Sequence, residues 1–117
     1  MNLDNPLFII PLSVGFIFVI AGYIMFKFPP KNINMLYGYR TRSSMKNKEM
    51  WDFAQLYSSK LMMNLGLLLA LSSILGFFVK LNEDIGTIVG LSMMFIVVII
   101  LFIKTETAIN QKFKNEN

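Results

Sequence analysis

The chain has 117 residues, of which 55% are hydrophobic and 15% are charged, and its formal net charge is +4. It contains no cysteine and no histidine, which excludes disulfide bonds, thiolate nucleophiles, the usual zinc sites and Ser-His catalytic pairs. We therefore expect neither an enzyme nor a metal or cofactor site, and a composition this apolar indicates a membrane protein.

Three apolar segments are each long enough to cross the hydrocarbon layer of a membrane, which takes roughly 20 residues of helix. They are residues 7–26, 61–79 and 85–103. Each is expected to be a helix, because a lipid-exposed strand leaves backbone groups unsatisfied, so the predicted fold class is an all-α membrane protein. Asp4, with no Lys or Arg beside it, precedes the first segment, which favours a retained span over a cleaved signal peptide. Pro11 inside this span predicts a kink or a later helix start.

The distribution of charge predicts how the spans are oriented. Residues 27–60 carry seven Lys and Arg against two acidic residues, a net charge of +5. Since basic loops stay on the cytoplasmic side, we expect this loop and the tail 104–117 in the cytoplasm, with the N-terminus and the turn 80–84 outside. The short turn predicts that the second and third spans form an antiparallel hairpin. Residues 1–117 then make a single membrane domain.

The second half of the loop has the pattern of an amphipathic helix at the membrane interface, with apolar residues at helical spacing and polar residues opposite them. The apolar side has Met50, Ala54, Tyr57 and Leu61, and the other side has Lys48, Asp52, Gln55 and Ser59. Asn47 is the expected N-cap, with Glu49 in the first turn, where the helix dipole favours a negative charge. This helix either continues into the second span or bends at Ser58 and Ser59.

Two groups of side chains in the loop have alternative interpretations. Trp51, Phe53 and Tyr57 are expected at the level of the lipid headgroups, where amphipathic rings are stable, or in a groove that binds a partner. Arg40 and Arg42 are either topology determinants attracted to anionic lipid, or one of them is an internal fastener that donates to a carboxylate or a backbone carbonyl. The spacing alone does not decide between these interpretations.

The segment YGYRTRSSMKNKEMWDFAQLYSSKLM, residues 37–62, resembles the signature of the SdpI family. The shared features are a Gly-x-Arg-Thr turn, a Ser-x-x-Asn stretch, a Glu-x-Trp pair and a Ser-Lys pair before a membrane helix. The matching residues are Gly38, Arg40, Thr41, Asn47, Glu49, Trp51 and Lys60. Arg42 stands where many members have proline, so it inherits no role.

The resemblance implies a multi-pass protein of the bacterial cell membrane. The namesake of the family protects its producer from a secreted peptide toxin and recruits a transcriptional repressor to the membrane. We therefore expect tolerance to a membrane-active peptide, with membrane lipids, a peptide toxin and a cytoplasmic repressor as candidate partners and no direct binding of nucleic acid. The chain resembles the C-terminal module of the longer namesake, which weakens the expectation of repressor recruitment. The alternative is a small accessory subunit or assembly factor of a transporter or envelope complex.

Small and polar residues inside the spans predict how the helices pack, because small residues four positions apart allow close approach. The pairs are Gly66 and Ala70, Ser72 and Gly76, and Gly86 and Gly90. They serve packing within the three-helix unit or self-association into a homo-oligomer, and Asn64 is expected to hydrogen-bond across helices. The spans contain no ionisable residue apart from Tyr23, which disfavours a proton-coupled carrier.

Overall fold

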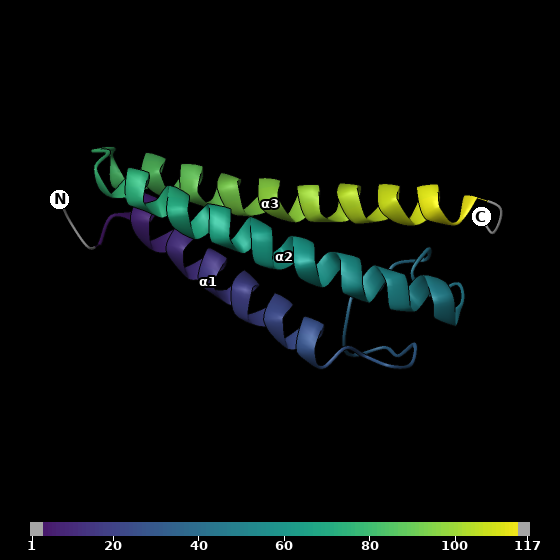
Figure 1. Cartoon of the computed structure of the whole chain (residues 1–117). Helices are drawn as coiled ribbons and strands as arrows, with labels where there is room; N and C mark the ends of the chain where they lie inside the picture. Colours follow the sequence, from purple (N-terminus) through teal and green to yellow (C-terminus); the bar gives the residue numbers. More distant parts are fainter. Residues whose placement is uncertain (1–3, 115–117) are drawn as a thin grey trace.

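The computed structural model describes residues 4–114 of the chain. Three helices follow one another in this part: α1 (Pro6–Lys27), α2 (Lys48–Phe77) and α3 (Glu83–Lys112). α2 and α3 run antiparallel, and α1 packs against both of them (Figure 1). The described residues contain no strand, and all three helices are long and apolar enough to cross a membrane. The predicted all-α membrane fold is therefore confirmed.

The first helix begins before the proline that interrupts its sequence pattern. Asn5 is the N-cap, and its side-chain oxygen accepts a hydrogen bond from the backbone N–H of Leu7 at 3.0 Å. Pro11 lies inside the helix and is buried, so the predicted later start is wrong. The Asn5 amide also donates to the carbonyls of Gly76 at 2.9 Å and Val79 at 3.0 Å. These bonds join the start of α1 to the end of α2.

The second helix is a continuous element of 30 residues, so the predicted interfacial helix runs into the second span without a break at Ser58 and Ser59. Asn47 caps it as expected, because its side-chain oxygen accepts from the N–H of Met50 at 2.8 Å. Glu49 lies in the first turn. The third helix also has 30 residues and continues to its end at residue 112, well into the segment that was expected to be a tail.

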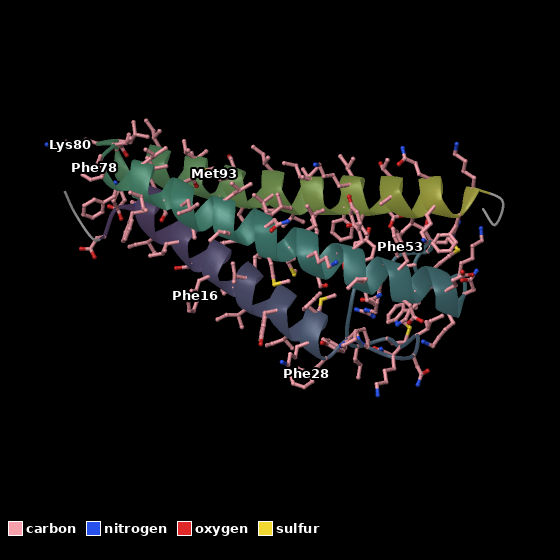
Figure 2. The ribbon with its side chains drawn as sticks, in the orientation of Figure 1. Phe16, Phe28, Phe53, Phe78, Lys80 and Met93 are labelled. Carbon is pink, nitrogen blue, oxygen red and sulfur yellow. The ribbon has the colours of Figure 1, made fainter. Side chains whose placement is uncertain are left out.

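The three helices differ in length, and this difference creates two distinct ends of the molecule. At 1.5 Å per residue, α2 and α3 are about 45 Å long and α1 is about 33 Å long. The turn end is where residues 78–82 join α2 to α3, and Phe78 and Lys80 mark it in Figure 2. The loop end is where residues 28–47 lie against the projecting ends of α2 and α3, near the labelled Phe53. Which end faces the cytoplasm stays a prediction.

Glycines bring the backbones of α1 and α2 into contact within the spans. A Cβ atom added to Gly15 would lie 2.7 Å from the backbone nitrogen of Ala70, and one added to Gly66 would lie 2.7 Å from the carbonyl oxygen of Gly15. Gly76 lies against the backbone of Leu7. No side chain fits at these three glycines, so the close approach of the two helices depends on them.

Two glycines of α3 lie against α1. A Cβ atom at Gly86 would lie 3.8 Å from Pro6, and one at Gly90 would lie 3.1 Å from Ile10. Gly66, Ala70 and Gly76 of α2, and Gly86 and Gly90 of α3, therefore lie against α1, inside the three-helix unit. Gly15 and Gly22 of α1 were not predicted to pack against α2, and a Cβ atom added to Gly22 would lie 2.8 Å from the carbonyl oxygen of Ser59.

The outer surface of the spans is apolar. Phe16 is 63% exposed and points away from the bundle, and Leu75 and Ile88 are exposed to a similar extent (Figure 2). Such a surface is stable in hydrocarbon and unfavourable in water. Asn64 lies on this surface, and among the described residues it makes no hydrogen bond, so the expected bond across helices is not formed.

Candidate functional site

The loop end has a folded core of its own, formed where the loop meets α2 and α3. Its buried apolar side chains come from α1, the loop, the start of α2 and the end of α3. They are Met25, Tyr39, Met50, Ala54, Ile109 and Phe113. The loop between the first two spans is therefore packed against helices rather than free in solvent, and residues of the family motif direct that packing.

Gly38 makes the turn from which the packed part of the loop begins. Its φ angle is +107°, a conformation that L side chains rarely adopt. A Cβ atom at this position would lie 2.6 Å from the side-chain oxygen of Gln55 and 2.7 Å from the ring of Pro30. Both the backbone angle and the space around it therefore require glycine.

Tyr39 is held at its backbone by one buried side chain of α2. The side-chain oxygen of Gln55 accepts from the N–H of Tyr39 at 2.6 Å, and its amide nitrogen donates to the carbonyl of Tyr39 at 2.7 Å. The exposed fraction of Gln55 is 1% and that of Tyr39 is 7%. The amide thus pairs with the loop backbone much as a neighbouring strand would, and it satisfies both groups away from water.

The residues that follow form a tight turn closed by Ser44. Its hydroxyl oxygen accepts from the N–H of Thr41 at 2.8 Å and lies 3.1 Å from the carbonyl of Tyr39. The N–H of Ser44 in turn donates to the hydroxyl of Thr41 at 3.2 Å. Ser44 is fully buried, so the hydrogen bonds of this turn are shielded from competition by water.

A carboxylate of α3 joins the loop to the third helix. The hydroxyl groups of Tyr39 and Thr41 both donate to the same oxygen of Glu106, at 2.6 and 2.7 Å. Burial, together with the neighbouring Glu106 carboxylate, raises the pKa of the Tyr39 hydroxyl well above its usual range. Tyr39 therefore stays protonated and acts as a hydrogen-bond donor, and donation to an ionised carboxylate is among the stronger kinds of hydrogen bond.

Trp51 is buried at the loop end and is not a membrane anchor. Its side chain is fully buried, and its indole N–H donates to the carbonyl of Pro30 at 2.7 Å. The expectation that its ring lies among the lipid headgroups is wrong, because the ring has no exposed surface. Phe53 and Tyr57 are half-buried, and Phe53 packs edge-on against Phe113 with ring centres 5.8 Å apart.

The two arginines of the motif turn differ in their contacts. Arg40 donates a guanidinium N–H to the backbone carbonyl of Met35, which is one of the fastener roles considered for it, although the side chain is exposed. Arg42 is exposed and makes no hydrogen bond or ion pair with the described residues. Within the described residues Arg40 forms no ion pair with a carboxylate. Asp52, which was considered as its partner, pairs with Lys48 at 2.9 Å.

The remaining motif residues lie at the edges of the loop-end core. Glu49 is exposed in the first turn of α2. The ammonium group of Lys60 lies 5.8 Å from the centre of the Phe26 ring, at the level where α1 leaves the span. A cation over an aromatic face is favourable, so this contact helps to hold the ends of α1 and α2 together.

The turn at Gly38 also covers a crevice between the helices. This crevice has a volume of about 350 Å³ and is bounded by all three helices and by residues 38–40. The crevice was not predicted from the sequence, because most of its walls are apolar side chains of the kind that any span contains. A convergent set of acidic and basic groups of the kind that catalysis needs is absent from these walls.

Several residues that build the site were not predicted. Gln55 and Ser59 were placed on the solvent side of the amphipathic helix, and both are buried. The buried face of α2 is wider than the predicted one because it also includes Trp51. Polar residues that lie beside Trp51 on the helix surface, one turn or two turns further on, are therefore buried with it. Glu106 could have been noticed as an acidic residue that lies just after the third span.

These features define the class of the protein, which is a multi-pass helical membrane protein with three spans and a loop folded onto one end of the bundle. Residues 31–105 match the SdpI/YfhL protein family, and the chain therefore belongs to it. The family is not a known family of enzymes. The chain is also similar to the uncharacterized protein YfhL of Bacillus subtilis (strain 168), with 48% identity over 56 residues. That alignment covers 48% of this chain and 51% of the relative, about half the length of each. No solved structure matches the chain.

Proposed function

We propose that this protein gives the cell that makes it tolerance to a membrane-active peptide toxin. The observation that carries the proposal is the extent of the family match, which runs from the packed loop through α2 to the end of the third span. Those residues contain Tyr39 and Gln55, which pair at the loop end, and Glu106 is the first residue beyond them. The part of the chain that defines the family thus includes the loop and the face of α2 to which the loop is fastened.

Three helices cannot enclose a wide aqueous path, so a peptide is more easily bound beside the bundle than passed through it. The spans offer a continuous apolar surface to a peptide that has entered the bilayer. At the loop end the exposed charges include Lys31, Arg42, Lys46 and Lys48. We propose that the apolar surface sequesters the peptide and that the basic loop end reports its presence to a cytoplasmic partner such as a repressor.

The test is survival of a sensitive bacterial host that expresses the chain and is challenged with a panel of secreted membrane-active peptides. We expect protection by the wild type and its loss in Gln55→Ala, which releases the loop from α2. The matched control is Gln111→Ala, since Gln111 is exposed near the end of α3. Membrane levels of the three proteins must be equal. Protection by none of them against any peptide, at good membrane levels, would contradict the proposal.

A second candidate is an accessory subunit of a transporter or envelope complex, and Asn64 is the observation that favours it. Its exposed amide lies inside a span without a hydrogen bond to the described residues, and a polar group in that position gains from a partner helix. Under this hypothesis a membrane protein co-purifies with the wild type in fixed ratio and is lost from Asn64→Leu. If the wild type purifies without any such protein, the result would contradict the subunit hypothesis and favour toxin tolerance.

A further inference from the structure

The crevice under the Gly38 turn lies at the level where the spans leave the membrane. Met25 on its wall is two residues from Lys27 at the end of α1, and Phe102 is two residues from Lys104 on α3. In Figure 1, α1 and α3 diverge toward this end, whereas their glycine contacts hold them together at the turn end. The crevice is therefore open where the chains of a bilayer lipid meet its headgroup.

The walls of the crevice match a hydrocarbon chain. They are formed mainly by apolar side chains from three helices, among them Phe18 and Met25 of α1, Met62 of α2 and Val98 and Leu101 of α3. Its volume of about 350 Å³ lies within the range of roughly 300–1,000 Å³ that is usual for small-ligand pockets. Phe102 is 46% exposed at its edge, so the entrance faces the surroundings and not the protein core.

A single cationic side chain stands at this entrance. Arg40 is exposed and belongs to the lining of the crevice, and within residues 4–114 its guanidinium group donates one hydrogen bond, to the carbonyl of Met35. A guanidinium group has five N–H donors arranged in a planar fork, so most of them remain available to an anion. Such a fork suits a phosphate group, to which it can donate two parallel hydrogen bonds.

The charges around the crevice favour an anion as well. None of the residues that line it is acidic. Glu106 bonds to Tyr39 on the crevice wall, and the oxygen that it presents there already accepts from the hydroxyls of Tyr39 and Thr41. The loop segment 27–60 has a net charge of +5. An anionic headgroup beside Arg40 therefore meets a positive potential with no competing carboxylate in the crevice.

The geometry points to a binding site for an anionic phospholipid, with one acyl chain in the crevice and the phosphate group held by Arg40. This assignment goes beyond toxin tolerance and does not depend on it. The Gly38 turn would then contribute directly to lipid binding, because it covers the crevice and also places Arg40 at the entrance of the crevice. It also distinguishes Arg40 from Arg42, which is two residues away and does not line the crevice.

The test is binding of defined lipids to the purified full chain, measured by native mass spectrometry in a mild detergent. The probes are phosphatidylglycerol and phosphatidylcholine with identical acyl chains, and glycerol phosphate without chains. Both lipids have a phosphate, but the choline cation of phosphatidylcholine offsets its charge and is repelled by Arg40 and the basic loop. We therefore expect the wild type to bind phosphatidylglycerol roughly tenfold more tightly than phosphatidylcholine. Arg40→Gln should lose this preference, and Arg42→Gln should keep it.

A second pair of variants tests the crevice without changing charge. Val98→Phe fills the crevice and should weaken binding of both lipids, whereas Ile99→Phe changes a side chain that is 54% exposed and should have no effect. Emission from Trp51, the single tryptophan, reports whether each variant has folded its loop end. Equal binding of the two lipids by the wild type, or equal losses in Arg40→Gln and Arg42→Gln, would overturn the assignment. Displacement of the lipid by glycerol phosphate would also overturn the assignment, in favour of a site for the headgroup without its chains. Displacement by a membrane-active peptide would overturn it in favour of a peptide site.

Discussion

The spans and the loop end of this protein are held together by different interactions. Among the described residues, the hydrogen bonds that join one span to another come from the Asn5 cap at the start of α1. The hydroxyls of Ser72, Ser73 and Ser92 bond to carbonyls of their own helices. The closest contacts between α1 and α2 are made by glycines that lie against backbone. At the loop end, side chains of α2 and α3 such as Gln55 and Glu106 donate to or accept from the loop instead.

The difference follows from the solvent on each side. Lipid chains are as apolar as leucine, so burying an apolar side chain between helices gains little, and close packing of small residues brings the helices together. Outside the hydrocarbon layer the loop must satisfy its backbone groups, and a fully paired polar network does this in a fixed geometry. The spans should therefore be sensitive to added volume, and the loop end to removal of polar groups.

The largest expected effect is from Gly66→Ala in the spans. The added Cβ atom would lie 2.7 Å from the carbonyl oxygen of Gly15, and this is backbone that cannot move without shifting α1. We expect the free energy of unfolding to fall by about 3 kcal/mol. The matched control is Gly86→Ala, where the nearest atoms are 3.8 Å away and the better helix propensity of alanine adds up to about 1 kcal/mol. Unfolding of both variants in a mixed-micelle titration checks this, and equal losses would contradict it.

The next effect is from Gln55→Ala at the loop end. It leaves the buried N–H of Tyr39 without its partner, whereas the carbonyl still has the hydroxyl of Ser44 nearby. We expect a loss of about 2 kcal/mol, the usual cost of one unsatisfied buried group and one lost bond. Gln111→Ala should change stability by less than about 0.5 kcal/mol, as is usual for exposed positions. A similar loss in both variants would show that the loop is not fastened by Gln55.

Alkaline pH provides a third test, through Tyr39. Its hydroxyl is neutral in the folded protein and has a raised pKa, whereas in the unfolded chain it ionises near its ordinary value of about 10. The unfolded state then binds fewer protons than the folded state above about pH 10, so stability falls there and is unaffected by this group below it. Compared with wild type, Tyr39→Phe should be less stable by about 1.5 kcal/mol at neutral pH, and this gap should narrow above about pH 10. A gap between the two proteins that stays constant above about pH 10 would contradict this account.

The smallest effect is expected for the arginines of the motif turn. Arg40→Lys loses a planar donor to the carbonyl of Met35 at an exposed position and should cost about 0.5 to 1 kcal/mol, while Arg42→Lys should be neutral. Thermal unfolding of the two variants beside wild type checks this. Equal and negligible changes in the two variants would contradict the fastener role of Arg40 and leave its positive charge, which helps to set the orientation of the spans, as its main structural role.

The same contrast explains what could be predicted from the sequence. The spans and the Asn47 cap follow from local rules of length, hydropathy and capping, and the structure has them close to the expected positions. The loop end depends on contacts between distant residues, such as Thr41 with Glu106, for which no local pattern exists. Trp51 and Gln55 were misplaced for a related reason. A sequence pattern distinguishes a wet face from an apolar one, but it does not show that a polar side chain will be covered by a folded loop.

The central claim is that the loop between the first two spans is a folded unit fastened to α2, and hydrogen exchange in lipid nanodiscs tests it most directly. The N–H groups of Tyr39 and Thr41 bond to buried side chains, whereas those of residues 31–33 are in an exposed stretch. We predict slow exchange at Tyr39 and Thr41, fast exchange at residues 31–33, and loss of the slow class in Gln55→Ala but not in Gln111→Ala. Uniformly fast exchange across residues 31–46 of the wild type would contradict the account.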